Sequence, residues 1–178
     1  MIELVPNVQP INCKIYPLST EEQKQLDKFL TENLQSGRIR PLKSPMAFPF
    51  FFVKKKDGRL RLVQDYQKLN ERTIKNCYHL PLIQELMDKL KNAEYFTKPN
   101  IWWGYNNVWI REGDEWKAAF RTNPGLFELL VMFFRLTNYP ATLQNMMNDL
   151  LRELVDRGKV IIYIDDIMIF TLTLEEHC

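Results

Sequence analysis

The chain has 178 residues, of which 46% are hydrophobic and 26% are charged, values that are ordinary for a globular protein. No apolar run reaches the roughly 18 residues of a membrane span, and no secretion signal opens the chain, so we expect an intracellular protein without membrane contact. The three cysteines show no paired spacing, and with only two histidines they form no zinc-binding pattern.

The net charge of +2 is unevenly distributed along the chain. Residues 38–75 contain eleven Lys and Arg against three Asp and Glu, a local charge of +8, which leaves −6 for the remainder. A basic segment beside an acidic remainder favours a polyanionic partner such as nucleic acid. A solvated basic face explains the same pattern and is the more common case when charge alone is considered.

An extended arm and a scaffold helix are the first elements that the sequence predicts. Residues 1–18 contain three prolines and no clear period, which favours an arm that lies on the body of the protein or leads into it. Ser19 and Glu22 fit a capping box that opens a helix, and Gly37 is placed to end it. The apolar stripe of this helix would consist of Leu26, Phe29, Leu30 and Leu34.

A basic β-hairpin is predicted over residues 48–64, after an irregular loop at 38–47. Asp57-Gly58 separates two strand-like runs, which is a strong signal for a hairpin turn. The hairpin carries Lys54, Lys55, Lys56, Arg59 and Arg61. Such a cationic projection suits contacts to phosphate oxygens. A soluble edge hairpin that lysines protect from aggregation is a competing interpretation.

The next segments alternate between helical and strand patterns. Pro81 opens a helix whose stripe we expect in the core, and residues 95–98 form a strand that leads toward Asn100. Residues 108–121 resemble a second hairpin, and 127–134 resemble an apolar strand. The stripe consists of Leu82, Leu86, Met87 and Leu90, and the second hairpin turns at Glu112, Gly113 and Asp114.

A third helix is predicted from Pro140 to Gly158. Its inward residues would be Leu143, Met146, Met147, Leu150, Leu151 and Leu154. The order of elements fits an antiparallel sheet with helices packed on one face. In such a sheet, the end of the strand near residue 100 could lie beside the hairpin that follows the third helix.

Residues 160–170, VIIYIDDIMIF, place Asp165 and Asp166 between two short apolar runs. This pattern predicts a β-hairpin with an acidic tip. Two adjacent like charges are costly without a positive partner, most simply a metal ion. An ordinary polar turn between two core strands explains the pattern equally well, because Asp is a common turn residue.

Five motifs, in the same order and spacing, resemble the reverse transcriptases of Ty3/gypsy-type long-terminal-repeat retrotransposons. They are FFVKKKDGRLRLVQDYQKLN, YFTKPNIWWGYNN, GDEWKAAFRT, LTNYPATLQNMMNDLLREL and YIDDIMIF, and together they cover about residue 15 to the C-terminus. The resemblance implies an α+β fold of fingers and palm, with the palm a ferredoxin-like antiparallel sheet with helices on one face. It divides the chain into an arm at 1–18, a fingers-like part at 19–93 with the basic hairpin 48–64, and a palm at 94–178, with thumb, connection and RNase H absent.

The resemblance also implies an RNA-directed DNA polymerase that uses two Mg²⁺ ions, an RNA or DNA template with primer, and dNTPs. Asp165 and Asp166 match metal-binding catalytic aspartates, and Lys55 and Arg61 match positions that hold the incoming triphosphate. Tyr105 matches the aromatic residue that stacks under the sugar and excludes a 2′-hydroxyl. Weaker matches to nucleic-acid contacts are Lys54, Lys56 and Tyr163.

The chain departs from the family at the third catalytic aspartate, where Asn100 stands. An amide carries no negative charge and bridges two Mg²⁺ ions less well, so weak or absent activity is predicted. Further departures are Pro99 inside an expected strand, Arg135 in place of a glycine, Phe133 in place of a proline and Tyr139 in place of a small residue. The alternatives are a non-catalytic remnant that binds nucleic acid and a fragment without function. Remaining polyprotein segments or a partner subunit are possible partners.

Overall fold

The computed structural model describes residues 2–56, 58–99, 108–133 and 135–177 of the chain. Its backbone forms two compact units that interleave along the sequence. The first unit combines Met1–Lys75 with Tyr105–Tyr139, and the second combines Asn76–Gly104 with Pro140–Cys178. The contiguous ranges 19–93 and 94–178 therefore do not coincide with the compact units, and they stay a prediction about functional subdomains.

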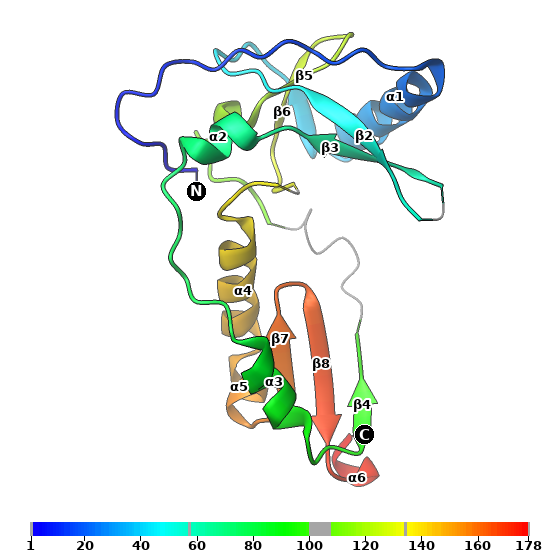
Figure 1. Ribbon diagram of the computed structural model, residues 1–178, viewed down its shortest axis with the longest axis vertical. Coiled ribbons are helices and arrows are strands. Elements are labelled where there is room, and N and C mark those ends of the chain that lie inside the picture. Colours follow the sequence, from blue (N-terminus) through cyan, green and yellow to red (C-terminus); the bar gives the residue numbers. More distant parts are fainter. Residues whose placement is uncertain (1, 57, 100–107, 134, 178) are drawn as a thin grey trace. The chain divides into compact units, whose positions relative to one another are not determined.

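In its described residues, the first unit contains two small antiparallel sheets and three helical segments. Strands β1, β6 and β5 form one sheet in that order, and β2 pairs with β3 in the other. The elements, labelled in Figure 1, are α1 (Thr20–Gln35), β1 (Ile39–Pro41), β2 (Phe50–Lys54), β3 (Leu60–Gln64), α2 (Gln67–Glu71), the 3₁₀ helix η2 (Glu115–Ala118), β5 (Phe120–Arg121) and β6 (Leu126–Leu129).

The predicted arm and first helix are both present. Residues 2–18 are largely extended and are tethered by isolated bridges from Leu4 to Thr73 and from Asn12 to Ala47. At the start of α1, the Ser19 N–H donates to Glu22 Oε2 at 2.8 Å, and the Glu22 N–H donates to Ser19 Oγ at 3.3 Å. This reciprocal pair is the capping box that the sequence predicts.

The core of the first unit contains a buried aromatic pair. Phe48 packs edge-on against Tyr66 with 5.5 Å between ring centroids, and the Tyr66 hydroxyl donates to the Ala118 carbonyl at 2.8 Å. Burial accordingly raises the pKa of Tyr66 well above its ordinary value. At the end of β3, Gln64 is only 1% exposed, and neither polar atom of its amide has a hydrogen-bond partner among the described residues.

Polar contacts hold Ile2, near the start of the chain, against the segment that contains η2 in the same unit. Asp114 Oδ2 accepts a 2.8 Å hydrogen bond from the Ile2 N–H, and Lys117 forms an ion pair with Asp114 and donates to the Ile2 carbonyl at 2.8 Å. Burial by itself would raise the pKa of Asp114, but the hydrogen bonds from Lys117 and Ile2 outweigh burial and lower that pKa.

The second unit is a three-stranded antiparallel sheet with helices. The strand order is β4–β8–β7, so the hairpin strand β8 is central. Its elements are α3 (Ile83–Leu90), β4 (Tyr95–Thr97), α4 (Tyr139–Leu150), α5 (Arg152–Asp156), β7 (Val160–Tyr163), β8 (Asp166–Thr171) and α6 (Leu174–His177), and Figure 1 shows β4, β8 and β7 side by side. The mixed helix and antiparallel-sheet composition confirms the α+β class. No helix in the described parts of the chain is long and apolar enough to cross a membrane.

Three sequence-based assignments are wrong in the first unit. Residues 39–41 form β1, within the segment expected to be a loop, because they pair with β6. Residues 108–121 do not form a hairpin: the turn at Gly113 exists, with φ of 87°, but it leads into η2, and β5 pairs with β6. The apolar strand expected at 127–134 is shorter, since β6 ends at Leu129.

Two helices of the second unit also differ from expectation. The predicted helix from 140 to 158 is broken into α4 and α5 at Leu151, and Leu150 is 71% exposed rather than inward. In α3 no residue is buried, and Leu82 at its N-cap and Met87 within it are 58% and 55% exposed. Helical periodicity predicts an apolar face correctly, but the neighbours that would cover that face depend on tertiary structure.

Candidate functional site

The acidic pair lies at the tight turn between β7 and β8, as the hairpin pattern predicts. Tyr163 and Asp166 are the last paired residues, so Ile164 and Asp165 form a two-residue turn. Of these two, only Ile164 has a positive φ, 59°, as in a type II′ turn, where glycine is the usual first residue. A β-branched residue in this conformation is strained, so the surrounding structure has to hold the turn in place.

Gln144 of α4 supplies this support from inside the second unit. Its side chain is 0% exposed, and its Oε1 accepts a 2.7 Å hydrogen bond from the Ile164 N–H. Its Nε2 donates to the Ile162 carbonyl at 3.2 Å and to Asn148 Oδ1 at 3.0 Å. One buried amide therefore ties α4 to both the end of β7 and the turn that carries the aspartates.

The end of β4 lies beside the acidic turn, as the sequence suggested for the strand near residue 100. Strand β4 pairs with β8 in the register Thr97–Ile169, and just beyond it Lys98 Nζ lies 2.7 Å from Asp166 Oδ1. Because β4 ends at Thr97, Pro99 lies outside the strand rather than within it, contrary to expectation. Proline has no N–H to donate to a ladder, so this position avoids the conflict.

Strand alternation assigns the candidate residues to one face of the β4–β8–β7 sheet. Tyr163 pairs directly with Asp166, so the two side chains share a face. Asp166 is exposed, and Tyr163 and Asp165 are half-buried. The opposite face carries the buried apolar residues Val160, Ile162 and Ile167. Near the turn, one face of the sheet thus belongs to the core and the other carries Tyr163 and Asp166, whereas farther along β8 the buried Phe170 lies on the Asp166 face.

The cationic side chains of the basic hairpin in the first unit lie on two different faces. Val53 pairs with Arg61, and the Lys55 N–H donates to the Arg59 carbonyl at 2.8 Å, so Lys55, Arg59 and Arg61 share one face of the hairpin. Lys54 pairs with Leu60 and lies on the other face, and Lys56 lies in the loop. All five side chains are exposed. Lys55 and Arg61, the two predicted triphosphate ligands, therefore point to the same side.

Two predicted site residues, Asn100 and Tyr105, lie outside the described residues. Within the described ranges, no three His, Cys, Asp or Glu side chains gather as a metal-binding group. Sequence reasoning missed two described residues at the acidic turn, Gln144 and Lys98. A Gln on the predicted inward face of the third helix was the available signal for the first, and a Lys two residues before Asn100 was the signal for the second.

The loop before α4 contains Arg135, the residue at which the sequence resemblance predicts a glycine. Arg135 has φ of 80°, in the left-handed region that favours glycine. Asn70 holds this loop, because its Nδ2 donates to the Arg135 carbonyl at 2.6 Å and its Oδ1 accepts from the Thr137 N–H at 2.9 Å. The backbone thus keeps a glycine-like conformation although the side chain is bulky.

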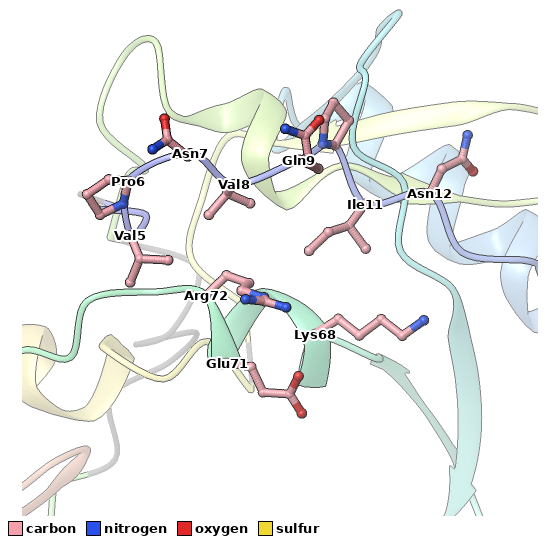
Figure 2. A pocket seen from close by; sticks show the side chains of 11 residues that line it. Val5, Pro6, Asn7, Val8, Gln9, Ile11, Asn12, Lys68, Glu71 and Arg72 are labelled. Atoms are coloured by element: carbon pink, nitrogen blue, oxygen red, sulfur yellow. The ribbon is translucent and has the colours of Figure 1, made fainter.

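Two cavities in the first unit do not involve the predicted site residues. One, of about 500 Å³, lies between the arm residues 5–12 and α2, and Figure 2 shows Arg72 between arm and helix while the Glu71 carboxylate points away. Another, of about 730 Å³, is walled by Trp109, Trp116 and the Arg40–Glu128 ion pair, among others. Neither is lined by an acidic-turn or basic-hairpin residue.

Comparison with known proteins assigns this arrangement to a family. The sequence profile of the family described as "Reverse transcriptase (RNA-dependent DNA polymerase)" matches residues 53–178. Transposon Tf2-3 and Tf2-4 polyproteins of Schizosaccharomyces pombe are each 37% identical to the chain over 176 residues, which is 99% of this chain and 13% of each polyprotein. The chain therefore spans only a small part of the length of these relatives.

Solved structures support the same assignment at the level of the fold. The foamy viral protease-reverse transcriptase in complex with an RNA/DNA hybrid matches with a TM-score of 0.87 and 22% identity, over 99% of this chain and 24% of that one. A second foamy viral protease-reverse transcriptase structure, in complex with double-stranded DNA, matches with a TM-score of 0.86 and 23% identity, over 96% of this chain and 30% of that one. The chain belongs to the reverse transcriptase family, and its relatives are retrotransposon polyproteins of the Ty3/gypsy type.

Proposed function

We propose that the chain is the fingers-and-palm part of an RNA-directed DNA polymerase within a retrotransposon polyprotein, acting by nucleotidyl transfer onto a primer. The observation that carries this proposal is the β7–β8 turn, which presents Asp165 and Asp166 beside the strand end that leads to position 100. Family membership supports a metal-binding role for this turn, which the geometry alone leaves open.

The residues at the turn fit the divalent ions that the proposal requires. Mg²⁺ prefers oxygen ligands and is commonly held by one or two carboxylates together with substrate phosphates. Asp165 and Asp166 supply two carboxylates on adjacent residues, and Asp166 is exposed to an incoming ligand. When bound, the ions would lower the pKa of the primer hydroxyl and neutralise charge on the triphosphate.

Other residues of the chain would bind and orient the substrates. Lys55 and Arg61 share a face of the basic hairpin, which suits contact with one triphosphate, because Arg forms paired hydrogen bonds with phosphate and Lys acts as a point charge. Tyr105 would stack under the sugar, and Tyr163 would contact the nucleic acid near the acidic turn. RNA or DNA template, primer and dNTPs are the proposed partners.

Asn100 is proposed to limit the activity of this chain. A neutral amide in place of the third aspartate removes one of three negative charges that would balance two Mg²⁺ ions. Loss of only an outer-shell partner typically costs about 10–100-fold in metal affinity or activity, so loss of a bridging ligand should cost at least that much. We expect little primer extension from the natural chain.

Primer extension on an RNA template with Mg²⁺ or Mn²⁺ tests both parts of this proposal. Asn100→Asp should raise product formation by at least about tenfold, and Asp165→Asn in that background should abolish it. The matched control is Asn76→Asp, which adds the same charge in the same unit. Equal extension by the natural chain and Asn100→Asp would refute the role of Asn100, and no extension by any variant would refute the polymerase proposal for this chain alone.

A second candidate function is nucleic-acid binding without catalysis. The observation that favours it is the exposure of all five hairpin cations. Each lost phosphate contact should reduce the slope of log affinity against log salt by about 0.7 for a single strand and 0.9 for duplex DNA. If the face that carries Lys55 contacts the phosphates, Lys55→Gln should make the slope less steep. Lys54→Gln, on the opposite face, should then change the slope less. Unchanged slopes in both variants would remove the hairpin from the binding surface.

A further inference from the structure

Asp166, one of the two carboxylates at the acidic turn, forms an ion pair with Lys98. Lys98 Nζ lies 2.7 Å from Asp166 Oδ1, and the two side chains are 58% and 63% exposed. Lys98 follows β4, and Asp166 begins β8, the strand with which β4 pairs. The register of this sheet therefore directs the ammonium group onto the carboxylate.

We propose that Lys98 acts as a competitor of divalent cations at the acidic turn: its ammonium group must leave Asp166 before that carboxylate can ligate a metal ion. The proposal rests on the proposed function, because it assumes that the ion binds at Asp165 and Asp166. It adds a residue that sets metal affinity through charge and through occupancy of a ligand oxygen.

The charges of the described residues support this role. Asp165 and Asp166 together carry −2, and Lys98 reduces this local charge to −1. A divalent cation is therefore attracted less strongly than two adjacent carboxylates alone would attract it. Asn100 contributes no negative charge that would offset the lysine. The ion pair of Lys98 with Asp166 and the neutral amide of Asn100 would both lower the affinity of the turn for a divalent cation.

The exposure of the pair limits the size of the effect. Exposed ion pairs have coupling energies that correspond to a factor of about 1.4 to 5 in an equilibrium constant. Replacing Lys98 with an uncharged side chain of similar length should thus tighten metal binding by about 1.4- to 5-fold. A purely structural salt bridge would change stability and leave metal affinity unchanged.

Direct metal binding separates these roles without nucleotide turnover. Mn²⁺ would be titrated into the full chain without nucleic acid, and free Mn²⁺ would be followed by electron paramagnetic resonance. The variants are Lys98→Met, Asp166→Asn, the double variant, and Lys98→Arg, which retains the positive charge. Lys91→Met is the matched control, because Lys91 forms a comparable exposed pair with Asp88 at 2.8 Å in the same unit.

We expect Lys98→Met to lower the Mn²⁺ dissociation constant about 1.4- to 5-fold, and Lys98→Arg to leave it close to that of the natural chain. Lys91→Met should have a smaller effect, and the gain from Lys98→Met should vanish when Asp166 is also replaced. Equal dissociation constants for the natural chain and Lys98→Met would overturn the role of Lys98. Absence of Mn²⁺ binding in both would overturn it as well, whereas the polymerase proposal is judged separately by primer extension of Asn100→Asp.

Discussion

Gln144 offers the sharpest test of how the acidic turn is held in place. The substitution Gln144→Leu keeps the approximate volume of the side chain, so it creates no large cavity, but it removes the acceptor of the Ile164 N–H. It also removes the donor to the Ile162 carbonyl and to Asn148 Oδ1, while Asn148 keeps its 2.9 Å hydrogen bond to the Tyr78 hydroxyl. The change is therefore concentrated on the turn and the end of β7.

The size of the effect follows from the burial of Gln144, which is 0% exposed. Leaving one buried donor unsatisfied costs about 1–3 kcal/mol, so we expect the free energy of unfolding to fall by about 2 kcal/mol. For a chain of this size, that loss corresponds to a decrease in Tm of roughly 4–8 °C. The strained φ of Ile164 should then relax, because its N–H no longer has a fixed partner.

Urea unfolding followed by circular dichroism measures the loss of stability, and hydrogen exchange of the Ile164 amide measures the local effect. The control is Gln84→Leu, because Gln84 is exposed and its amide contacts the exposed Asp88 at 3.4 Å. This surface change should stay within about 0.5 kcal/mol of the natural chain. If Gln144→Leu matches the control and the Ile164 amide exchanges as slowly as before, Gln144 does not hold the turn.

Three further predictions concern stability in the first unit. Arg135→Gly should stabilise the chain by about 1 kcal/mol because glycine tolerates the φ of 80°, whereas Arg135→Ala should not; equal unfolding midpoints for the two would contradict the strain argument. Gln64→Leu should raise the free energy of unfolding by about 1–3 kcal/mol because it removes a buried amide that has no hydrogen-bond partner among the described residues; a lower free energy of unfolding in urea would contradict this. The pKa of Asp114 is lower in the folded chain than its ordinary value of 3.8. The stability that the ionised Asp114 contributes is therefore complete above pH 3.8 and is lost as the pH falls through the lower pKa of the folded chain. Asp114→Asn should therefore lower the free energy of unfolding at pH 7 by about 1.5 kcal/mol, and the difference in stability between the variant and the natural chain should become smaller in acid. A difference in stability that stays constant from pH 7 into acid would contradict this reasoning.

The sequence determined the local structure of this protein wherever short-range chemistry decides it. The Ser19 capping box, the hairpin at Gly58 and the acidic hairpin of β7 and β8 all follow from a few neighbouring residues, and all are present. Motif order was enough to predict the reverse transcriptase family, because several motifs agreed at the right spacing. These features depend on contacts within a few residues, which a sequence pattern encodes directly.

Tertiary structure decided what surrounds those local elements. Strand β1 exists because β6 gives its backbone a partner 88 residues away, from Arg40 to Glu128, and no pattern within residues 38–47 could reveal that partner. The exposed apolar face of α3 and the break between α4 and α5 depend likewise on which neighbours cover a helix. At the acidic turn, the sequence predicted Asp165 and Asp166. The register of β4 on β8 brings Lys98 to Asp166. The packing of α4 brings Gln144 to the turn. Long-range pairing has no signal in local periodicity, so the contacts of Gln144 and Lys98 with the turn became visible only in the folded structure.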